Sequence, residues 1–292
     1  MDRTALLARI RQIELRSRKR LTSKMLGNFQ ATTRGRGLVF DTVRPYEMGD
    51  NVRDIDWNVT ARTGELHIKQ YIEDRQYQVM LLVDVSQSMG VNTTAHTRMD
   101  AIAEVATTIA WSAILNQDAV GLITFAEQTL EVLRPANHQM QLDYILKHLL
   151  DNEVLHPSPK TSLKSALNTF THVINTPSFI FILSDFQFDL TDAQDLLRYL
   201  TRFHDVVAIR FADPLELRPI PKTAIVQVQD SESGLRRRID TTHSVYRRPP
   251  SSPHAQVFLQ SLGIDWLTLS LHEDYLSQFL NFIQIRSERV KK

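Results

Sequence analysis

Two apolar runs that each lead into an aspartate constrain the fold of this chain more than any other feature. Residues 79–85 read VMLLVDV and residues 178–185 read SFIFILSD, and neither run carries a charged side chain before its aspartate. Strands that are apolar on both faces are typical of a parallel sheet covered by helices on both sides. The two runs therefore predict a buried parallel sheet whose strands end in carboxylates.

Helical and strand-like segments alternate around these two runs. Apolar residues recur every three to four positions over 99–116, which is the spacing of a helix. Further strands are predicted at 119–125, 129–135, 205–211 and 263–271, and further helices at 138–151, 161–174, 191–203, 255–262 and 273–290. This alternation predicts an α/β fold with a doubly wound, mostly parallel sheet flanked by helices.

One segment interrupts the alternation. Residues 222–240 hold two alternating runs around Asp-Ser-Glu-Ser-Gly at 230–234, a pattern that is typical of a hairpin. We therefore expect a β-hairpin inserted into a sheet domain that spans residues 77–292.

Residues 1–76 precede this domain and begin with a strongly basic stretch. Ten Lys and Arg against two acidic residues give residues 1–37 a charge of +8, although the net charge of the whole chain is only +1. Apolar residues at helical spacing predict an amphipathic helix over 4–26, followed by a turn-rich segment with short strands. We expect both parts to pack on the main domain, with contact to a partner protein, nucleic acid or a membrane surface as alternatives for the helix.

The absence of cysteine limits the chemistry that the chain can perform. It excludes disulfides, thiolate metal sites and cysteine nucleophiles, so a metal must be held by oxygen or imidazole. No stretch is apolar for long enough to form a secretory signal or a membrane span. We expect a cytoplasmic protein without a transmembrane segment, for which peripheral association with a membrane stays open.

Oxygen-bearing side chains gather where the two apolar runs end. Asp84, Ser86 and Ser88 alternate along the chain and face one point if the chain curls after the strand. Asp185 ends the second run, and Thr161 follows a loop that leads into a helix. Such a set suits a hard cation, Mg²⁺ first and Mn²⁺ or Ca²⁺ after it. The alternative for Ser88 is a simple cap of the next helix.

This arrangement resembles the metal-ion-dependent adhesion site of von Willebrand factor A domains. The resemblance implies five metal ligands: Asp84, Ser86, Ser88, Thr161 and Asp185. The loop departs from that family, because Pro159-Lys160 and Ser162 stand where relatives have glycines and an aspartate. In such a site the protein supplies fewer ligands than the ion accepts, so an acidic side chain of a partner protein completes the coordination.

A block of residues before the first apolar run resembles a more specific family. Residues 35–40 read GRGLVF, residues 44–50 read RPYEMGD and residues 53–57 read RDIDW, with Ala61-Arg62 after them. This block resembles the signature of the family called domain of unknown function 58, and the likeness extends over roughly residues 30–290. It implies a MoxR-type AAA+ ATPase as partner, in systems that mature or assemble other proteins. The mixed charges of the block favour local salt bridges over a direct partner surface.

The expected function is therefore a non-enzymatic, metal-dependent protein-binding module. The chain lacks a P-loop, a GxGxxG after a strand, a GxSxG elbow and an HExxH motif. The alternative is an Mg²⁺-dependent phosphoester hydrolase that uses Asp84 and Asp185. A second alternative is nucleic-acid binding through the basic helix, although no aromatic side chains interleave with its arginines, so we expect no stable nucleic-acid complex.

Overall fold

The computed structural model describes the following stretches of the chain: residues 38–73, 78–90, 97–150, 161–213, 225–229, 236–240 and 253–290. Residues 38–73 belong to a smaller compact unit, and the described residues from Gln78 onward belong to a larger one. The basic helix predicted at 4–26 lies outside the described residues. The packing predicted for residues 1–76 on the main domain therefore stays a prediction.

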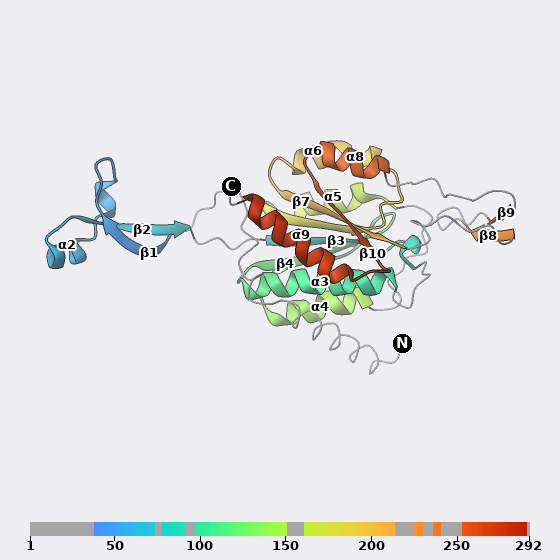
Figure 1. The fold of residues 1–292 in the computed structure, drawn as a ribbon, viewed down its shortest axis with the longest axis horizontal. Helices are drawn as coiled ribbons and strands as arrows, with labels where there is room; N and C mark the ends of the chain where they lie inside the picture. The colour runs from blue at the N-terminus through green and yellow to red at the C-terminus, as the bar shows by residue number, and fades with distance from the viewer. Residues whose placement is uncertain are drawn as a thin grey trace. The chain divides into compact units, whose positions relative to one another are not determined.

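The larger unit is built on a six-stranded sheet with the order β10-β7-β6-β3-β4-β5 (Figure 1). Its strands are β3 (Gln78–Asp84), β4 (Ala119–Phe125), β5 (Thr129–Ala136), β6 (Ser178–Ser184), β7 (Asp205–Ala212) and β10 (Asp265–Ser270). Neighbouring strands run parallel, except for β4 and β5, which are antiparallel. The predicted mostly parallel sheet is confirmed.

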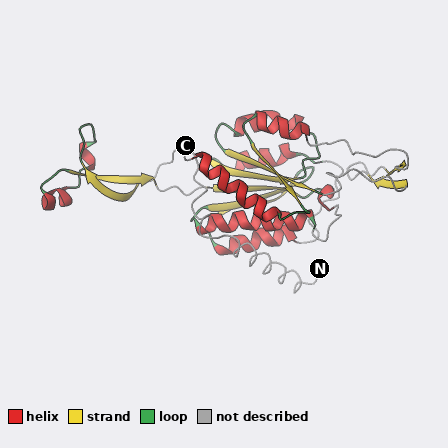
Figure 2. Cartoon of the chain, in the orientation of Figure 1, coloured by secondary structure: helices red, strands yellow, loops and turns green. Residues whose placement is uncertain are grey.

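Helices cover both faces of this sheet (Figure 2). One face carries α3 (Arg98–Leu115), α4 (Gln139–Leu150) and α9 (Tyr275–Val290). The other carries α5 (Leu163–Val173), α6 (Gln194–Leu200) and α8 (Pro253–Ser261). The doubly wound arrangement is therefore confirmed as well. None of the helices in the described stretches has the length and apolar character needed to cross a membrane.

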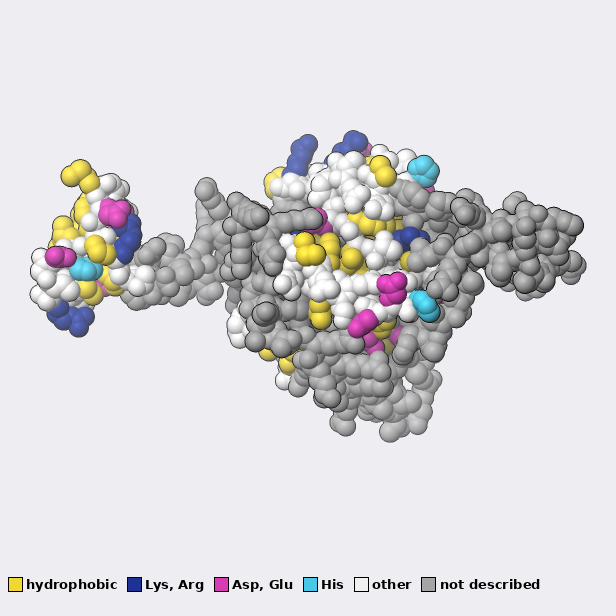
Figure 3. Space-filling view, viewed as in Figure 1, with side chains coloured by type: hydrophobic (Ala, Val, Ile, Leu, Met, Phe, Trp, Pro, Cys, Tyr) yellow, Lys and Arg dark blue, Asp and Glu magenta, His cyan; other side chains and the backbone are white. Residues whose placement is uncertain are grey.

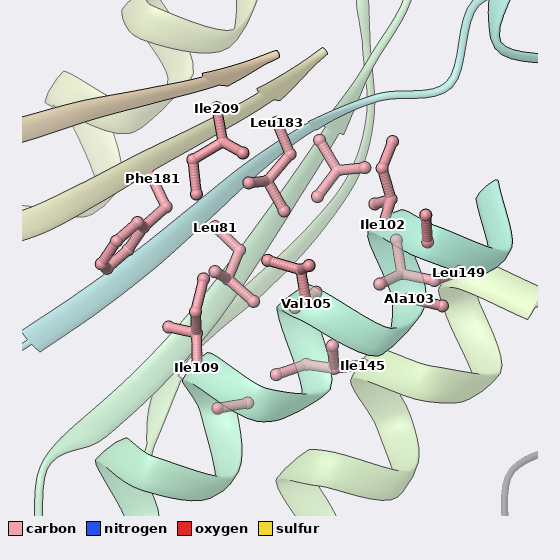
Figure 4. Close-up of a cluster of buried hydrophobic side chains, with 14 of the residues drawn as sticks. Leu81, Ile102, Ala103, Val105, Ile109, Ile145, Leu149, Phe181, Leu183 and Ile209 are labelled. Atoms are coloured by element: carbon pink, nitrogen blue, oxygen red, sulfur yellow. The ribbon is translucent and has the colours of Figure 1, made fainter. Parts of the chain in front are cut away.

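The core consists of two layers, one on each side of the sheet. Alternate residues of β3 feed them, with Leu81 on the α3 side and Leu82 on the α5 side, both fully buried. Ile102, Val105 and Ile109 of α3 face the first layer (Figure 4). Full burial of one such side chain stabilises the fold by about 1.5–3 kcal/mol. This two-sided burial explains why the strands lack the polar alternation of a half-exposed sheet.

The helix predicted over 191–203 is shorter in the structure. It begins as a 3-10 turn, η3 (Thr191–Ala193), and continues as α6 only to Leu200. The helix ends there because the backbone N–H groups of Phe203 and His204 both donate to the carbonyl of Leu200, which closes the chain into a turn. The other predicted helices and strands of the larger unit differ from the observed bounds by a few residues at most.

The predicted hairpin is confirmed. Its strands, β8 (Ile225–Gln229) and β9 (Arg236–Asp240), pair antiparallel and form a two-stranded sheet of their own. The hairpin follows β7 and precedes α8 in the chain, so it is an insertion between two elements of the doubly wound fold.

The smaller unit is a two-stranded antiparallel sheet with short helical turns. Its elements are β1 (Leu38–Pro45), η1 (Val52–Asp54), α2 (Trp57–Thr63) and β2 (His67–Glu73). Arg44 and Asp50 form a bidentate salt bridge across the turn after β1, with N···O distances of 2.7 and 2.8 Å. This is a local salt bridge of the kind that the mixed charges of the segment predict. Apolar side chains also lie at the surface of this unit (Figure 3), and Trp57 is 65% exposed.

Candidate metal centre

The chain curls sharply where β3 ends. Asp84 is the last residue of the strand, and the 3-10 turn η2 (Gln87–Gly90) begins three residues later. Val85 and Met89 are fully buried in the core layer under α3, and they anchor this curl from both ends. Asp84 directly precedes Val85, and Ser86 and Ser88 lie between the two anchors, so these three polar residues are held at the carboxyl edge of the sheet.

Three predicted ligands come together in this curl. The backbone N–H of Ser86 donates to Asp84 Oδ1 at 2.9 Å, and the hydroxyls of Ser86 and Ser88 lie 3.1 Å apart. All three are buried, with 0% exposure for Asp84, 2% for Ser86 and 7% for Ser88. The structure therefore places one carboxylate and two hydroxyls in a single protected cluster.

The fourth predicted residue, Asp185, joins the cluster from the neighbouring strand. It follows β6, which pairs in parallel with β3, and its side chain is fully buried. Ser184 links the two strand ends, since its hydroxyl donates to Asp84 Oδ2 at 2.6 Å. Sequence reasoning missed this role of Ser184, although its position directly before a strand-end aspartate was a usable signal.

The residue after Asp185 has an unusual backbone conformation. Phe186 has a φ of 51°, in the left-handed region that bulky side chains rarely adopt. Its ring is fully buried, and the centroid of this ring lies 4.9 Å from that of Trp266. Its backbone N–H donates to the Ser184 hydroxyl. Strained positions of this kind cost about 1–3 kcal/mol and cluster at functional sites, where the surroundings hold them in place.

A buried arginine lies against the cluster. Arg98 Nη1 donates to the backbone carbonyl of Ser88 at 2.8 Å and to Asp185 Oδ2 at 3.2 Å, and the side chain is only 3% exposed. It stands at the start of α3, where Thr97 and Asp100 form a reciprocal capping box that fixes the helix terminus. The sequence predictions did not include Arg98.

The electrostatics of the cluster favour an added cation. Burial, followed by the nearby charge of Asp185, raises the pKa of Asp84 to about 7, although hydrogen bonds from Ser184 and Ser86 oppose this shift. Asp84, Asp185 and Arg98 together carry a charge of −1 when both carboxyls are ionised. The donor set of carboxylates and hydroxyls fits a hard divalent cation such as Mg²⁺.

The fifth predicted ligand, Thr161, lies in the loop before α5 and not at the end of a strand. Thr161 is half-buried and precedes α5, and the N–H of its neighbour Ser162 donates to the carbonyl of Ala126 at 2.8 Å. That bond puts the loop beside the carboxyl end of β4, at the same edge of the sheet as Asp84. None of the described hydrogen bonds joins Thr161 to the other four residues, so its role as a ligand stays a prediction.

A further buried carboxylate follows the next strand. Asp213 comes directly after β7 and is only 2% exposed. The sequence signal that identified Asp84 and Asp185, a buried strand running into an aspartate, also applies to it. Over the described stretches, no group of three or more His, Asp or Glu side chains is placed to hold a metal. A metal at this centre would draw on serine hydroxyls as well as on carboxylates.

Comparison with known proteins identifies relatives whose functions are not described. The family model described as "Protein of unknown function DUF58" matches residues 42–253. The chain is 26% identical to "Uncharacterized protein Rv1480" of Mycobacterium tuberculosis (strain ATCC 25618 / H37Rv) over 292 residues, which cover 98% of this chain and 91% of that one. These matches agree with the family resemblance found in the upstream block.

Two solved structures are similar to this chain at low sequence identity. The crystal structure of a conserved hypothetical protein, BatB, from Bacteroides thetaiotaomicron matches with a TM-score of 0.51 at 15% identity, over 74% of this chain and 100% of that chain. The VWA domain of SpRpn10 matches with a TM-score of 0.43 at 13% identity, over 71% of this chain and 95% of that chain. At such low identity, the BatB likeness supports the α/β fold alone.

Proposed function

Because the chain belongs to the family described as protein of unknown function DUF58, which names no activity, we propose its function from the geometry of the site. The protein is a non-enzymatic binding module that captures a partner protein through a divalent metal ion. The observation that carries this proposal is a cluster of two fully buried carboxylates and two serine hydroxyls at the carboxyl edge of the sheet.

The ion would be held by the residues of the cluster. Ser86 and Ser88 offer hydroxyl oxygens, Asp84 and Asp185 offer negative charge, and Thr161 is the proposed fifth ligand from the loop before α5. Mg²⁺ is the first choice, with Mn²⁺ or Ca²⁺ after it, because these ions prefer oxygen ligands. The bound cation would lower the pKa of Asp84 toward its usual range, since a nearby positive charge favours the ionised carboxyl.

The partner would supply the missing ligand. A hard cation held by few protein oxygens accepts a further carboxylate, so an Asp or Glu of the partner would dominate the contact. The resemblance to the family implies a MoxR-type AAA+ ATPase as partner, in the maturation or assembly of other proteins. We include that partner, and a cytoplasmic location, in the proposal.

Metal binding is the first test. Isothermal titration of the full chain with Mg²⁺ and with Mn²⁺ should show a single site in the wild-type protein, and Asp84→Ala should weaken binding by about tenfold or more because it removes a charged ligand. Asp195→Ala is the matched control, since Asp195 is fully exposed on α6. Equal affinity in the wild type and in Asp84→Ala would contradict the proposal.

Capture of the partner is the second test. A pull-down with a purified MoxR-type ATPase should succeed in Mg²⁺, fail in EDTA and fail with Asp84→Ala. Nucleic-acid binding would instead survive EDTA and weaken steeply with salt. Hydrolysis of p-nitrophenyl phosphate that is lost in Asp84→Ala would favour the phosphoester hydrolase over the binding module.

A further inference from the structure

The six-stranded sheet has two lateral edges, and one of them is protected. Strand β5 forms this edge, and its pairing with β4 is irregular at two places. It carries the exposed charges of Glu131 and Arg134 and also contains Pro135. Charged side chains, proline and irregular pairing are the devices by which proteins prevent an edge strand from pairing with another chain.

The opposite edge lacks these devices. Strand β10 reads DWLTLS, and its six residues pair with β7 in an unbroken parallel register. After Asp265 the strand contains neither a charged residue nor proline, and its side chains are partly buried, except that of Leu269, which is fully buried. Within the described part of the chain, β10 pairs with β7 alone. Such a regular edge offers unpaired backbone N–H and C=O groups to an extended peptide.

A pocket of about 400 Å³ lies beside the start of this strand. Ile264 and Trp266 line it from the core layer under α8, whereas Phe282 and Ile285 line it from α9 on the opposite face. The pocket is therefore walled from both faces of the sheet and lies at the sheet edge. An added strand points its side chains alternately to the two faces, so such a pocket would receive a large apolar side chain from it.

The charge at the rim of the pocket is negative. Arg286 donates to Asp265 Oδ2 at 2.6 Å and also to Asp205 Oδ1. Two carboxylates thus face one guanidinium, and they are more exposed, at 35% for Asp265 and 29% for Asp205, than Arg286 at 15%. The net charge of −1 lies on the solvent side of the cluster, where it complements a basic side chain.

We propose that β10 binds an extended segment of a partner protein, which adds a strand to the sheet, places a large apolar side chain in the pocket and sets a basic side chain beside Asp205 and Asp265. This interaction needs no metal ion and is separate from the proposed capture of an acidic side chain at the carboxyl edge. The protein then holds two recognition surfaces of opposite charge preference.

A second copy of this chain fits the edge less well. Antiparallel pairing of β10 with itself, centred on the strand, would place Ser270 opposite Asp265 and Leu269 opposite Trp266. Leu269 is fully buried in its own core, and a serine is too small to fill the pocket. A different chain with a large apolar residue is the better occupant.

The test uses short peptides that are selected from a random display library for binding to the full-length chain. Excess EDTA is present throughout, so that no divalent metal ion contributes to binding. Selected peptides should alternate apolar residues and carry Lys or Arg, and they should protect the backbone amides of residues 265–270 from hydrogen exchange. Ile285→Arg should weaken peptide binding by about tenfold or more, because it fills the pocket and repels a basic side chain. Ile285 is 54% exposed, so the substitution leaves the core intact.

The matched control is Val257→Arg on α8, which is 68% exposed and does not line the pocket. It should change affinity less than about twofold. The proposal is overturned if no peptide is selected, if protection falls outside β10, or if Ile285→Arg binds as well as the control. A concentration-dependent dimer that Thr268→Lys dissociates would overturn it in favour of self-pairing. Loss of metal binding in Asp84→Ala has no bearing on these outcomes.

Discussion

Two clusters of the larger unit contain the same three ionisable groups, two aspartates and one arginine, yet they are built differently. The carboxyl-edge set consists of Asp84, Asp185 and Arg98, and the amino-edge set consists of Asp205, Asp265 and Arg286. The first lies where β3 and β6 end, and the second lies where β7 and β10 begin, near α9. Their compositions match, so burial and hydrogen bonding decide what each set can do.

In the amino-edge set the arginine lies between its partners. Arg286 donates to both carboxylates, and each of them keeps about a third of its side chain in contact with solvent. In the carboxyl-edge set, Arg98 donates to Asp185, whereas the donors to Asp84 among the described residues are the neutral groups of Ser86 and Ser184. Both sets carry the same formal charge of −1, but this charge is partly exposed to solvent in the amino-edge set and buried in the carboxyl-edge set, where it favours an added cation.

The largest effect should come from removing the arginine of the carboxyl-edge set. Arg98→Met would leave two fully buried carboxylates without this cation, and we expect a loss of about 3–5 kcal/mol in the free energy of unfolding. Urea denaturation in EDTA measures this loss. Added Mg²⁺ should restore part of the stability, and a loss below about 1 kcal/mol would contradict the view that the charges depend on Arg98.

The next effect is a pH dependence of stability that follows from Asp84. The pKa of its carboxyl is raised from 3.8 to about 7 by burial and by Asp185, so the folded protein holds a proton that the unfolded chain releases. Stability in EDTA should therefore fall as pH rises from about 4 to about 7, by at most about 1.4 kcal/mol per pH unit, and level off above that range.

Urea denaturation across this pH range tests the effect by comparison with Asp84→Asn. The variant should show a flatter profile, because its amide does not titrate, and saturating Mg²⁺ should flatten the wild-type profile in the same way. Parallel profiles for the wild type and Asp84→Asn would show that Asp84 titrates near its usual value in the folded protein.

The smallest effect should come from the amino-edge set. Arg286→Met removes a cation from two carboxylates that remain partly hydrated, and we expect a loss of about 1–2 kcal/mol, which Mg²⁺ does not restore. The measurement is the same urea denaturation used for Arg98→Met. A loss of unfolding free energy as large as that of Arg98→Met would contradict the proposed difference between the two sets.

Much of this architecture is predictable because its signals are local. An apolar strand that ends in an aspartate is recognisable from seven or eight residues, and parallel strands bring such ends to one edge of the sheet. Asp84 and Asp185 are predictable on that basis, and Ser86 and Ser88 from their alternation after the first strand; the structure places the four residues together. The inserted hairpin was predictable for the same reason, since its turn residues are adjacent in the chain.

The remaining contacts depend on tertiary structure. Arg98 meets Asp185 across 87 residues of sequence, and nothing in its local pattern sets it apart from a surface arginine at a helix start. Trp266 and Ile285 line one pocket only because β10 and α9 fold against each other. Thr161 could be placed at the correct edge of the sheet, but its orientation depends on a loop whose residues carry no regular pattern.

The parallel pairing of β3 with β6 also determines when the proposed metal centre can form. Gln78 is in register with Ser178, and Ser184 bonds to Asp84 across 100 residues of chain. At a synthesis rate of roughly 5–20 residues per second, β3 leaves the ribosome several seconds before its partner exists. The apolar strand β3 and half of the proposed centre are then present without β6, so the nascent chain is vulnerable to aggregation during this interval.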